Sequence, residues 1–210
     1  MSGNESKEKL VYYESIRGRL QEMLKGLGDN PVVNLEIGSG GSPTFDLITQ
    51  MRELADNELY LSVDSDEEIG RLENGLEGFN DNFITIHADA REMPFVEDNS
   101  VDEITMTNVV GLSKMRQRDS LTKLFKELCR VSKNDGRIVI TEVLSPDRFS
   151  LEFYFEGELK TGTTVSGAGW DLVIEKMDEE PEAIKEYYPA FSDDYVVRKP
   201  FQLVLKCVKK

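Results

Sequence analysis

The chain has 210 residues, of which 25 are lysine or arginine and 40 are aspartate or glutamate, and its net charge is −15 at pH 7. This length suits one α/β domain with a full core, so we expect a single domain over residues 1–210 rather than two enzyme domains. The negative charge disfavours binding to nucleic acid, because phosphate contacts need clustered lysine and arginine. No apolar run approaches the roughly 18 residues of a membrane span.

The first two thirds of the chain alternate between helical and strand patterns. An amphipathic helix is predicted over residues 8–27, where a Gly-Leu-Gly run ends the apolar periodicity. Further helices are predicted at residues 43–56, 66–77 and 121–131. Strands are predicted at residues 31–37, 59–64, 83–87, 101–107 and 137–141. Strands that alternate with helices indicate a parallel sheet that is covered on both faces.

The pattern loosens after residue 143. An aromatic segment at 149–155 is followed by a loop-like run of small residues at 161–169, and strands are predicted at 170–174 and 201–208. Residues 175–194 are rich in acids and carry three aromatic residues. We interpret this acidic segment as a solvated insertion, with a partner-binding segment as the alternative.

The first predicted strand runs into a glycine turn and a helix start. Gly38 and Gly40 lack the Cβ that would keep a ligand away from the backbone, and Ser42 and Pro43 suit the first turn of a helix. Glu36 is a carboxylate at a buried strand end, where it needs a partner such as a ligand, turn amides or water. The layout is typical of a nucleotide-cofactor site, although a tight strand-to-helix connection is the alternative.

Asp64 ends the second strand a little over 20 residues after that turn, where a carboxylate can accept hydrogen bonds from both ribose hydroxyls. Taken alone, this aspartate would be a turn former. Dinucleotide-binding dehydrogenases share both features, but their fingerprint requires a third glycine where this chain has Pro43. A nicotinamide-dependent oxidoreductase is therefore the weakest of the hypotheses considered.

Two later segments resemble the class I S-adenosylmethionine-dependent methyltransferases. Residues 89–102, D-A-R-E-M-P-F-V-E-D-N-S-V-D, are similar to the family's passage D-A-x-x-L-P-F-x-D-x-S-F-D. Residues 127–140 are similar to the helix, K-P-G-G turn and strand that follow it, with Asn134 and Asp135 in place of Pro-Gly. The resemblance covers residues 30–143. The middle of the chain is most similar to the quinone and small-molecule type of this family. Residues 109–111, however, lack the histidine that is common in the quinone-type relatives.

The resemblance implies a Rossmann-like α/β fold, with a mostly parallel seven-stranded sheet, helices on both faces and an antiparallel last strand. It implies S-adenosyl-L-methionine as the cofactor and assigns binding roles to nine residues. These are Glu36, Gly38, Ser39 and Gly40 at the methionine end, Asp64 at the ribose, Ser65 after it with no particular part of the cofactor assigned, Asp89 and Ala90 at the adenine, and Asn108 on the methionine side next to the acceptor. Residues 144–210 would form the acceptor side.

No catalytic residue is assigned from the sequence. Displacement of a methyl group from a sulfonium can proceed by alignment and desolvation, which contribute roughly 7–11 kcal/mol without an acid or base. The one histidine, His87, is expected simply to end the third strand. If a proton must leave the acceptor, Tyr12, Tyr13 and Tyr154 are candidates to take it.

The acceptor is expected to be a small molecule that the sequence does not identify. We expect Tyr12 and Tyr13 and the aromatic segment 149–155 to form walls of its pocket, with ordinary core packing as the alternative for these rings. A second hypothesis is a non-catalytic S-adenosylmethionine-binding or interaction protein with the same fold, because no acceptor motif is recognisable.

The compartment and redox state follow from two further features. Residues 1–9 are polar and charged, without the apolar stretch of a secretory signal, so a cytoplasmic protein is expected. Cys129 and Cys207 make no spaced pair, which indicates buried or idle thiols rather than a disulfide or a metal site.

Overall fold

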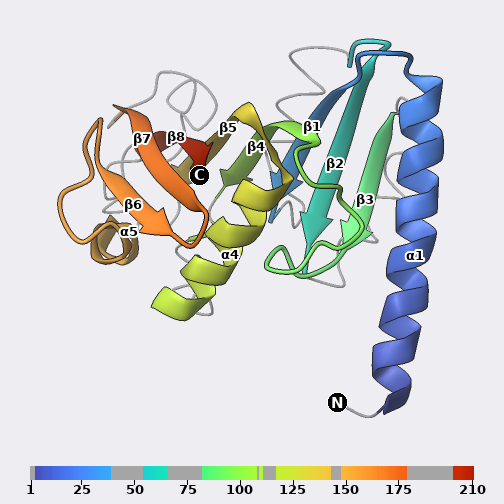
Figure 1. Cartoon of the computed structure of the whole chain (residues 1–210), viewed down its shortest axis with the longest axis horizontal. Coiled ribbons are helices and arrows are strands. Elements are labelled where there is room, and N and C mark those ends of the chain that lie inside the picture. The colour runs from blue at the N-terminus through green and yellow to red at the C-terminus, as the bar shows by residue number, and fades with distance from the viewer. Residues whose placement is uncertain are drawn as a thin grey trace, which may run out of the picture.

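The computed structural model describes residues 3–38, 54–65, 82–107, 109–110, 117–142, 148–178 and 201–210. Within them, eight strands form one sheet in the order β3-β2-β1-β4-β5-β8-β7-β6 (Figure 1). The strands are β1 (Val32–Ile37), β2 (Glu58–Asp64), β3 (Phe83–His87), β4 (Val101–Thr107), β5 (Ser132–Glu142), β6 (Thr164–Gly167), β7 (Trp170–Asp178) and β8 (Phe201–Lys209). The helices are α1 (Gly3–Gly26), α4 (Arg118–Val131) and α5 (Arg148–Tyr154).

The first five strands are parallel, as the alternating pattern predicts. In the register, Ile37 of β1 lies beside Val63 of β2 and Met106 of β4, and Asp64 of β2 lies beside His87 of β3. The carboxyl ends of these four strands therefore meet at one edge of the sheet, where open α/β sheets bind their ligands. The fold class predicted from the sequence is confirmed.

The last three strands are antiparallel, and the sheet has one strand more than the seven expected. β8 pairs with β5, β7 with β8, and β6 with β7. The additional strand is β6, within the run of small residues predicted to be a loop. It is an edge strand with no buried residue, so it carries no apolar alternation by which the sequence could reveal it.

The N-terminal helix α1 runs along the sheet and extends past the carboxyl ends of β2 and β3 (Figure 1). Its buried residues Tyr13, Ile16 and Leu20 follow the predicted helical spacing. Leu10 belongs to the same periodic pattern, yet 57% of its surface is exposed. The pattern predicts one continuous apolar stripe, but the described strands cover only the part of that stripe from Tyr13 onward.

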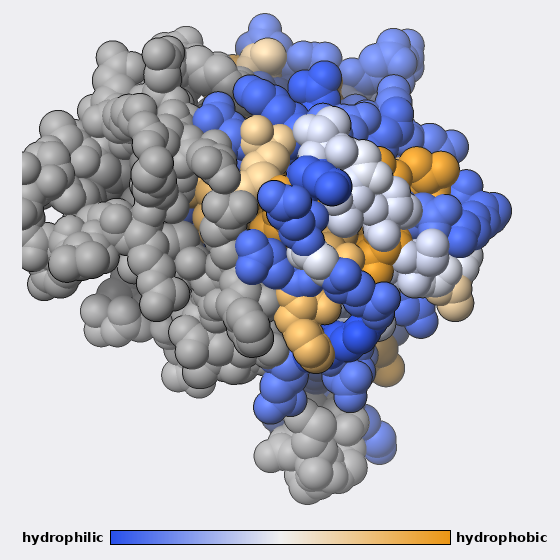
Figure 2. All heavy atoms as spheres, turned by 90° about the vertical axis from the view of Figure 1, so that its left-hand side faces the viewer, coloured by the Kyte–Doolittle hydropathy of each residue, from blue (hydrophilic) through white to orange (hydrophobic). Residues whose placement is uncertain are grey.

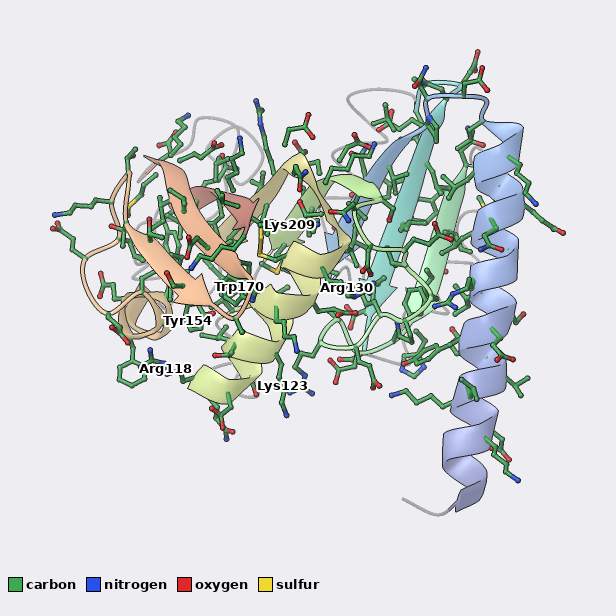
Figure 3. All side chains as sticks on the ribbon, in the orientation of Figure 1. Arg118, Lys123, Arg130, Tyr154, Trp170 and Lys209 are labelled. Atoms are coloured by element: carbon green, nitrogen blue, oxygen red, sulfur yellow. A yellow bond between two sulfur atoms is a disulfide. The ribbon has the colours of Figure 1, made fainter. Side chains whose placement is uncertain are left out.

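Helix α4 contributes the largest buried face of the described helices, and one of its residues corrects a prediction. The buried residues are Ser120, Leu121, Leu124, Phe125, Leu128, Cys129 and Val131. Cys129 is joined to Cys207 of β8 by a disulfide (Figure 3), so the expectation of two idle thiols is wrong. The two residues are 78 positions apart in sequence, and only the packing of α4 on the antiparallel part of the sheet brings them together.

Several predicted segments fall outside the described residues. These are the predicted helix at 66–77, residues 43–53 of the helix predicted at 43–56, and residues 179–194 of the acidic segment. Residues 54–56 are not helical, and residues 175–178 continue strand β7. Among the described helices, none combines the length and apolar character of a membrane span.

Candidate cofactor site

The carboxyl edge of the parallel strands brings together three of the segments singled out from the sequence. The Gly38 amide donates a hydrogen bond to the Val63 carbonyl oxygen over 2.8 Å, which fixes the start of the glycine turn beside the end of β2. The Ala88 amide donates to the Asp64 carbonyl oxygen, also over 2.8 Å. Asp64, Ser65 and Asp89 thus lie at neighbouring strand ends, as parallel topology predicts.

A cavity of about 330 Å³ opens at this edge. Its floor comes from the ends of β2 and β3 and its outer wall from α1. The lining residues are Lys9, Tyr12, Tyr13, Ser65, His87, Ala88 and Asp89. Two of the nine predicted cofactor-binding residues, Ser65 and Asp89, line the cavity directly, and the neighbouring Ala90 is buried. Ser39, Gly40 and Asn108 lie outside the described residues.

Gly38 occupies a position that only glycine fits without strain. Its φ is +77°, in the left-handed region, and a Cβ added there would lie 2.4 Å from Cγ2 of Val109. Val109 is 3% exposed and follows the end of β4. The glycine turn is therefore packed against the segment after β4, which lies next to Asn108 in the sequence.

Glu36 and Glu142 are buried carboxylates near the ends of β1 and β5, each with 1% of its surface exposed. The Tyr60 hydroxyl donates to Glu36 Oε2 over 3.2 Å. The Val110 amide donates to Glu142 Oε1 over 2.8 Å, so Glu142 holds the segment after β4 against the end of β5. Charge-assisted contacts of this kind are the usual condition for burying a carboxylate. The sequence analysis did not single out Glu142.

Asp89 is held by Arg91, which the sequence analysis did not single out either. Asp89 Oδ1 accepts from the Arg91 amide and Nε, each over 2.9 Å, and Oδ2 accepts from Nη2 over 2.6 Å. These bonds, with smaller contributions from Lys9, hold the pKa of the Asp89 carboxyl below its usual value of 3.8. Asp89 therefore stays ionised at neutral pH, which suits an acceptor of hydrogen bonds.

Replacing Arg91 by Met is expected to return the Asp89 pKa toward 3.8, because the carboxylate loses its charged donors. Since the folded-state pKa is the depressed one, the pair stabilises the fold fully above pH of about 4 and this contribution is lost as pH falls through the folded-state pKa. A carboxyl-carbon NMR titration of Asp89 measures the midpoint. Arg118→Met is the control, and an unchanged midpoint in Arg91→Met would contradict the assignment.

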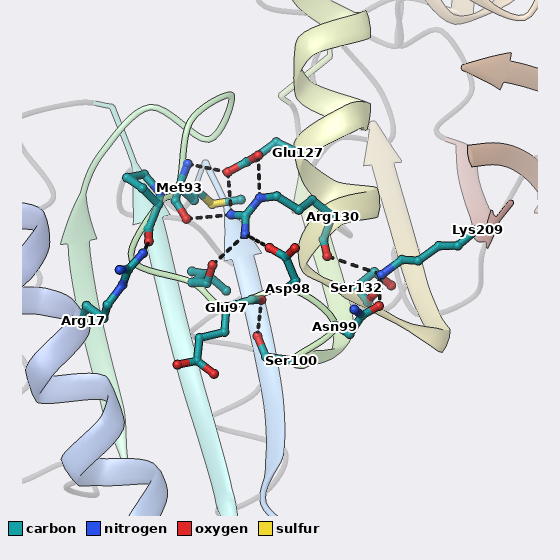
Figure 4. A network of polar contacts seen from close by, with 12 residues as sticks. Arg17, Met93, Glu97, Asp98, Asn99, Ser100, Glu127, Arg130, Ser132 and Lys209 are labelled. Atoms are coloured by element: carbon teal, nitrogen blue, oxygen red, sulfur yellow. Dashed lines mark hydrogen bonds and ion pairs between the residues drawn. The ribbon is translucent and has the colours of Figure 1, made fainter. Parts of the chain in front are cut away.

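The segment after Asp89 is fixed by a polar network centred on Arg130 of α4 (Figure 4). Arg130 donates to the carbonyl oxygens of Met93 over 2.8 Å and Val96 over 2.9 Å, and it pairs with Glu127. Glu127 in turn accepts from the Met93 amide over 2.6 Å. The two motif segments of the sequence resemblance, 89–102 and 127–140, are thus bonded to each other.

The aromatic residues predicted to line one acceptor pocket lie in two separate places. Tyr12 and Tyr13 of α1 flank the cavity beside Ser65 and Asp89. Tyr154 lies beside α4, with its ring centroid 5.0 Å from that of Phe125 and 2% of its surface exposed (Figure 3). The expectation of a shared wall is therefore wrong, because β3 and α5 lie on opposite sides of the central strands. For Tyr154, the alternative of core packing is correct.

Two of the three candidate proton acceptors, Tyr13 and Tyr154, are poorly suited to that role. Burial raises the pKa of Tyr13 and of Tyr154, which makes loss of the phenolic proton harder. His87 ends β3, as expected, and its Nε2 lies 3.2 Å from the Ser65 carbonyl oxygen. His87 thus links the ends of β2 and β3.

A second hollow lies beside α5. The side of the molecule that carries β6, β7 and α5 has a described surface that is mainly hydrophilic, with separate apolar areas (Figure 2). The hollow has a volume of about 670 Å³ and is lined by Arg118, Glu152, Phe153, Glu156, Gly157 and Glu158. Arg118 pairs with Glu156 and lies 5.9 Å from the Phe153 ring centroid. This hollow includes none of the predicted cofactor-binding residues.

The comparisons with known proteins agree with the geometry. An open α/β sheet with three polar segments at its carboxyl edge defines a nucleotide-ligand fold of the Rossmann-like class. A family model described as a methyltransferase domain matches residues 35–140, which is half of the chain. The chain therefore belongs to this family of methyltransferase domains, and its fold is that of the class I S-adenosylmethionine-dependent methyltransferases. None of the curated proteins compared with the chain matches it.

Solved structures with this fold are similar over most of the chain but share little sequence. The 16S rRNA methyltransferase KamB has a TM-score of 0.61 at 15% identity, covering 92% of this chain and 94% of its own. A sarcosine dimethylglycine methyltransferase from Galdieria sulphuraria has a TM-score of 0.52 at 16% identity, covering 94% and 85%. A SAM-dependent methyltransferase from Aquifex aeolicus has a TM-score of 0.51 at 17% identity, covering 90% and 88%.

Proposed function

We propose that this protein transfers the methyl group of S-adenosyl-L-methionine to a small-molecule acceptor by in-line displacement. One observation carries the proposal. Ser65 and Asp89, which follow the ends of β2 and β3, line a cavity of about 330 Å³, and Gly38, where the glycine turn begins, is bonded to Val63 near the end of β2. That volume is at the lower end of the range for small-ligand sites, and it suits the adenosine part of the donor.

The residues present fit the donor in their chemistry. Asp64 and Ser65 would hold the ribose, Asp89 would accept from the adenine amino group, and Ala90 would offer a neighbouring amide. The turn that begins at Gly38 starts beside the end of β2, where its backbone would approach the donor. Glu36, Ser39, Gly40 and Asn108 are proposed for the methionine end from the sequence resemblance.

The bound donor would supply a sulfonium methyl carbon that a nucleophilic acceptor can attack, with S-adenosylhomocysteine as the leaving group. The chain's own task is to orient donor and acceptor and to exclude water, which contributes roughly 7–11 kcal/mol when alignment is good. The raised pKa values of Tyr13 and Tyr154 support a reaction that does not depend on either of these tyrosines as a base.

A small molecule is favoured over RNA as the acceptor. The solved structures that share this fold include a protein named as an rRNA methyltransferase and one named for sarcosine and dimethylglycine, and at 15–16% identity neither name decides the acceptor here. The net charge of −15 supports the small molecule, because an RNA backbone would be repelled without a clustered basic surface.

Replacing Asp64 by Ala is expected to weaken S-adenosylhomocysteine binding by roughly 1.5–3 kcal/mol, or about 10- to 150-fold in Kd, the range for hydrogen bonds to a charged group. Titration calorimetry of the wild type and the variant measures the change. The wild-type Kd is expected in the micromolar range, which corresponds to a binding free energy of about −8 kcal/mol. Asp29→Ala is the control, because Asp29 is an exposed aspartate between α1 and β1, at the opposite edge of the sheet. Equal affinities in the two variants would mean that the ribose is held elsewhere.

A screen of metabolite extracts with radiolabelled S-adenosylmethionine tests the transfer itself, and a labelled small molecule is the expected result. Donor binding without any labelled product would favour the alternative of a non-catalytic binding protein. If neither S-adenosylmethionine nor S-adenosylhomocysteine gives heat or a thermal shift at millimolar concentration, the proposed function is wrong. Parallel titration with NAD tests the nicotinamide hypothesis, and no binding is expected.

A further inference from the structure

Helix α1 forms the outer wall of the cavity next to Ser65 and Asp89. Three of its residues, Lys9, Tyr12 and Tyr13, line the cavity. They lie in the N-terminal half of α1 (Figure 1), and they share the cavity with Ser65 and His87 at the ends of β2 and β3. No motif of the sequence resemblance includes them, because that resemblance begins only at residue 30.

Tyr12 is fixed in place while part of its ring stays accessible. Its hydroxyl oxygen accepts a hydrogen bond from the His87 amide over 3.3 Å, at the end of edge strand β3. Its neighbour Tyr13 packs on the other side, with ring centroids 5.8 Å apart. Even so, 43% of the surface of Tyr12 is exposed, while Tyr13 is 7% exposed. Of the two tyrosines that line the cavity, Tyr12 therefore offers a ligand the larger accessible surface.

The helix that carries Tyr12 is bonded to the segment that carries Asp89. Lys9 Nζ pairs with Glu92 over 2.9 Å, Arg17 donates to the Pro94 carbonyl oxygen, and Gln21 donates to Glu97 over 3.1 Å. The same segment is held from the opposite side by Arg130 (Figure 4). The position of Tyr12 relative to Asp89 is thus set by bonds along three turns of α1.

We propose that Tyr12 is a donor-binding residue, whose ring contacts the adenine of S-adenosylmethionine, rather than a wall of the acceptor pocket. The inference rests on the proposed function. An exposed aromatic ring in a cavity that is also lined by a carboxylate, Asp89, presents the two features that an adenine recognises, a surface for its π-face and an acceptor for its amino group. Helix α1 then belongs to the donor half of the site.

The test is the affinity of three variants for S-adenosylhomocysteine and for 5′-methylthioadenosine, which share the adenine. Tyr12→Ala is expected to weaken both by the same factor, roughly 5- to 150-fold, as for loss of a base-stacking ring. Tyr12→Phe keeps the ring and is expected to stay within about threefold of wild type. Leu10→Ala, an exposed residue of α1 outside the cavity, is the matched control and is expected to bind normally.

A second readout avoids dependence on the stability of the alanine variant. In Tyr12→Trp, saturating S-adenosylhomocysteine is expected to quench the fluorescence of the new indole. The wild type, whose one tryptophan is Trp170 in β7, gives the background fluorescence that is subtracted. Absence of binding by the wild-type chain overturns the proposed function. Normal affinity in Tyr12→Ala, or unchanged emission in Tyr12→Trp, overturns this inference alone.

Discussion

Opening the disulfide between Cys129 and Cys207 is expected to lower the free energy of unfolding by about 4 kcal/mol, because a cross-link across 78 residues removes much of the entropy of the unfolded chain. Both residues are buried, with 2% and 0% of their surfaces exposed. Reductant should therefore act slowly on the native state and quickly on the unfolded state. Denaturant titrations of the same preparation, oxidised and reduced, measure the difference directly.

The control is the double variant Cys129→Ala/Cys207→Ala, whose stability should not respond to reductant. A thiol assay under denaturing conditions should detect no free thiol in the oxidised wild type and two after reduction. Two thiols before reduction, with no change of stability on adding reductant, would contradict the bridge. Disulfides are rare in reducing compartments, so the redox state of the protein's surroundings decides whether this stabilisation is present.

Gly38→Ala is expected to destabilise the fold by roughly 2–5 kcal/mol, the sum of left-handed strain and overpacking. The φ of +77° accounts for the first part, and the 2.4 Å approach to Val109 Cγ2 accounts for the second. Because the turn at Gly38 would also approach the donor, S-adenosylhomocysteine affinity is expected to fall with stability. Denaturant unfolding and calorimetry measure the two effects.

The two causes can be separated. Gly28→Ala introduces a side chain at φ +89° with no atom within 4 Å, so it measures the backbone strain alone. In the double variant Gly38→Ala/Val109→Ala the clash is relieved, and the loss should be smaller than the sum of the single losses by about 1–3 kcal/mol. If the two single losses of unfolding free energy simply add, the contact with Val109 is not what destabilises the Gly38→Ala variant.

Much of the fold was predictable from the sequence, because its signals are local. The strands at 83–87 and 101–107 are rich in β-branched residues, and their bounds agree with the structure. Parallel topology then places the carboxyl ends of the parallel strands at one edge, so the joint location of Gly38, Asp64 and Asp89 followed from chain order alone. The binding roles of these three residues stay predictions.

Other predictions failed where the deciding contact joins distant parts of the chain. Strand β6 forms because a short polar segment pairs with β7, and such a segment has no periodicity of its own. The pairing of Cys129 with Cys207 depends on how α4 packs against β8, which two isolated cysteines do not encode.

The site shows the same division. The sequence by itself determined that a glycine turn and two aspartates would meet at the carboxyl edge, because strand ends and chain order suffice for that. Only the tertiary structure showed that Arg91 forms an ion pair with Asp89. Only it showed that Tyr12 lines the cavity beside Asp89 and lies far from Tyr154. Those outcomes depend on side-chain direction and on where α1 lies against the sheet, and residue spacing along the chain specifies neither.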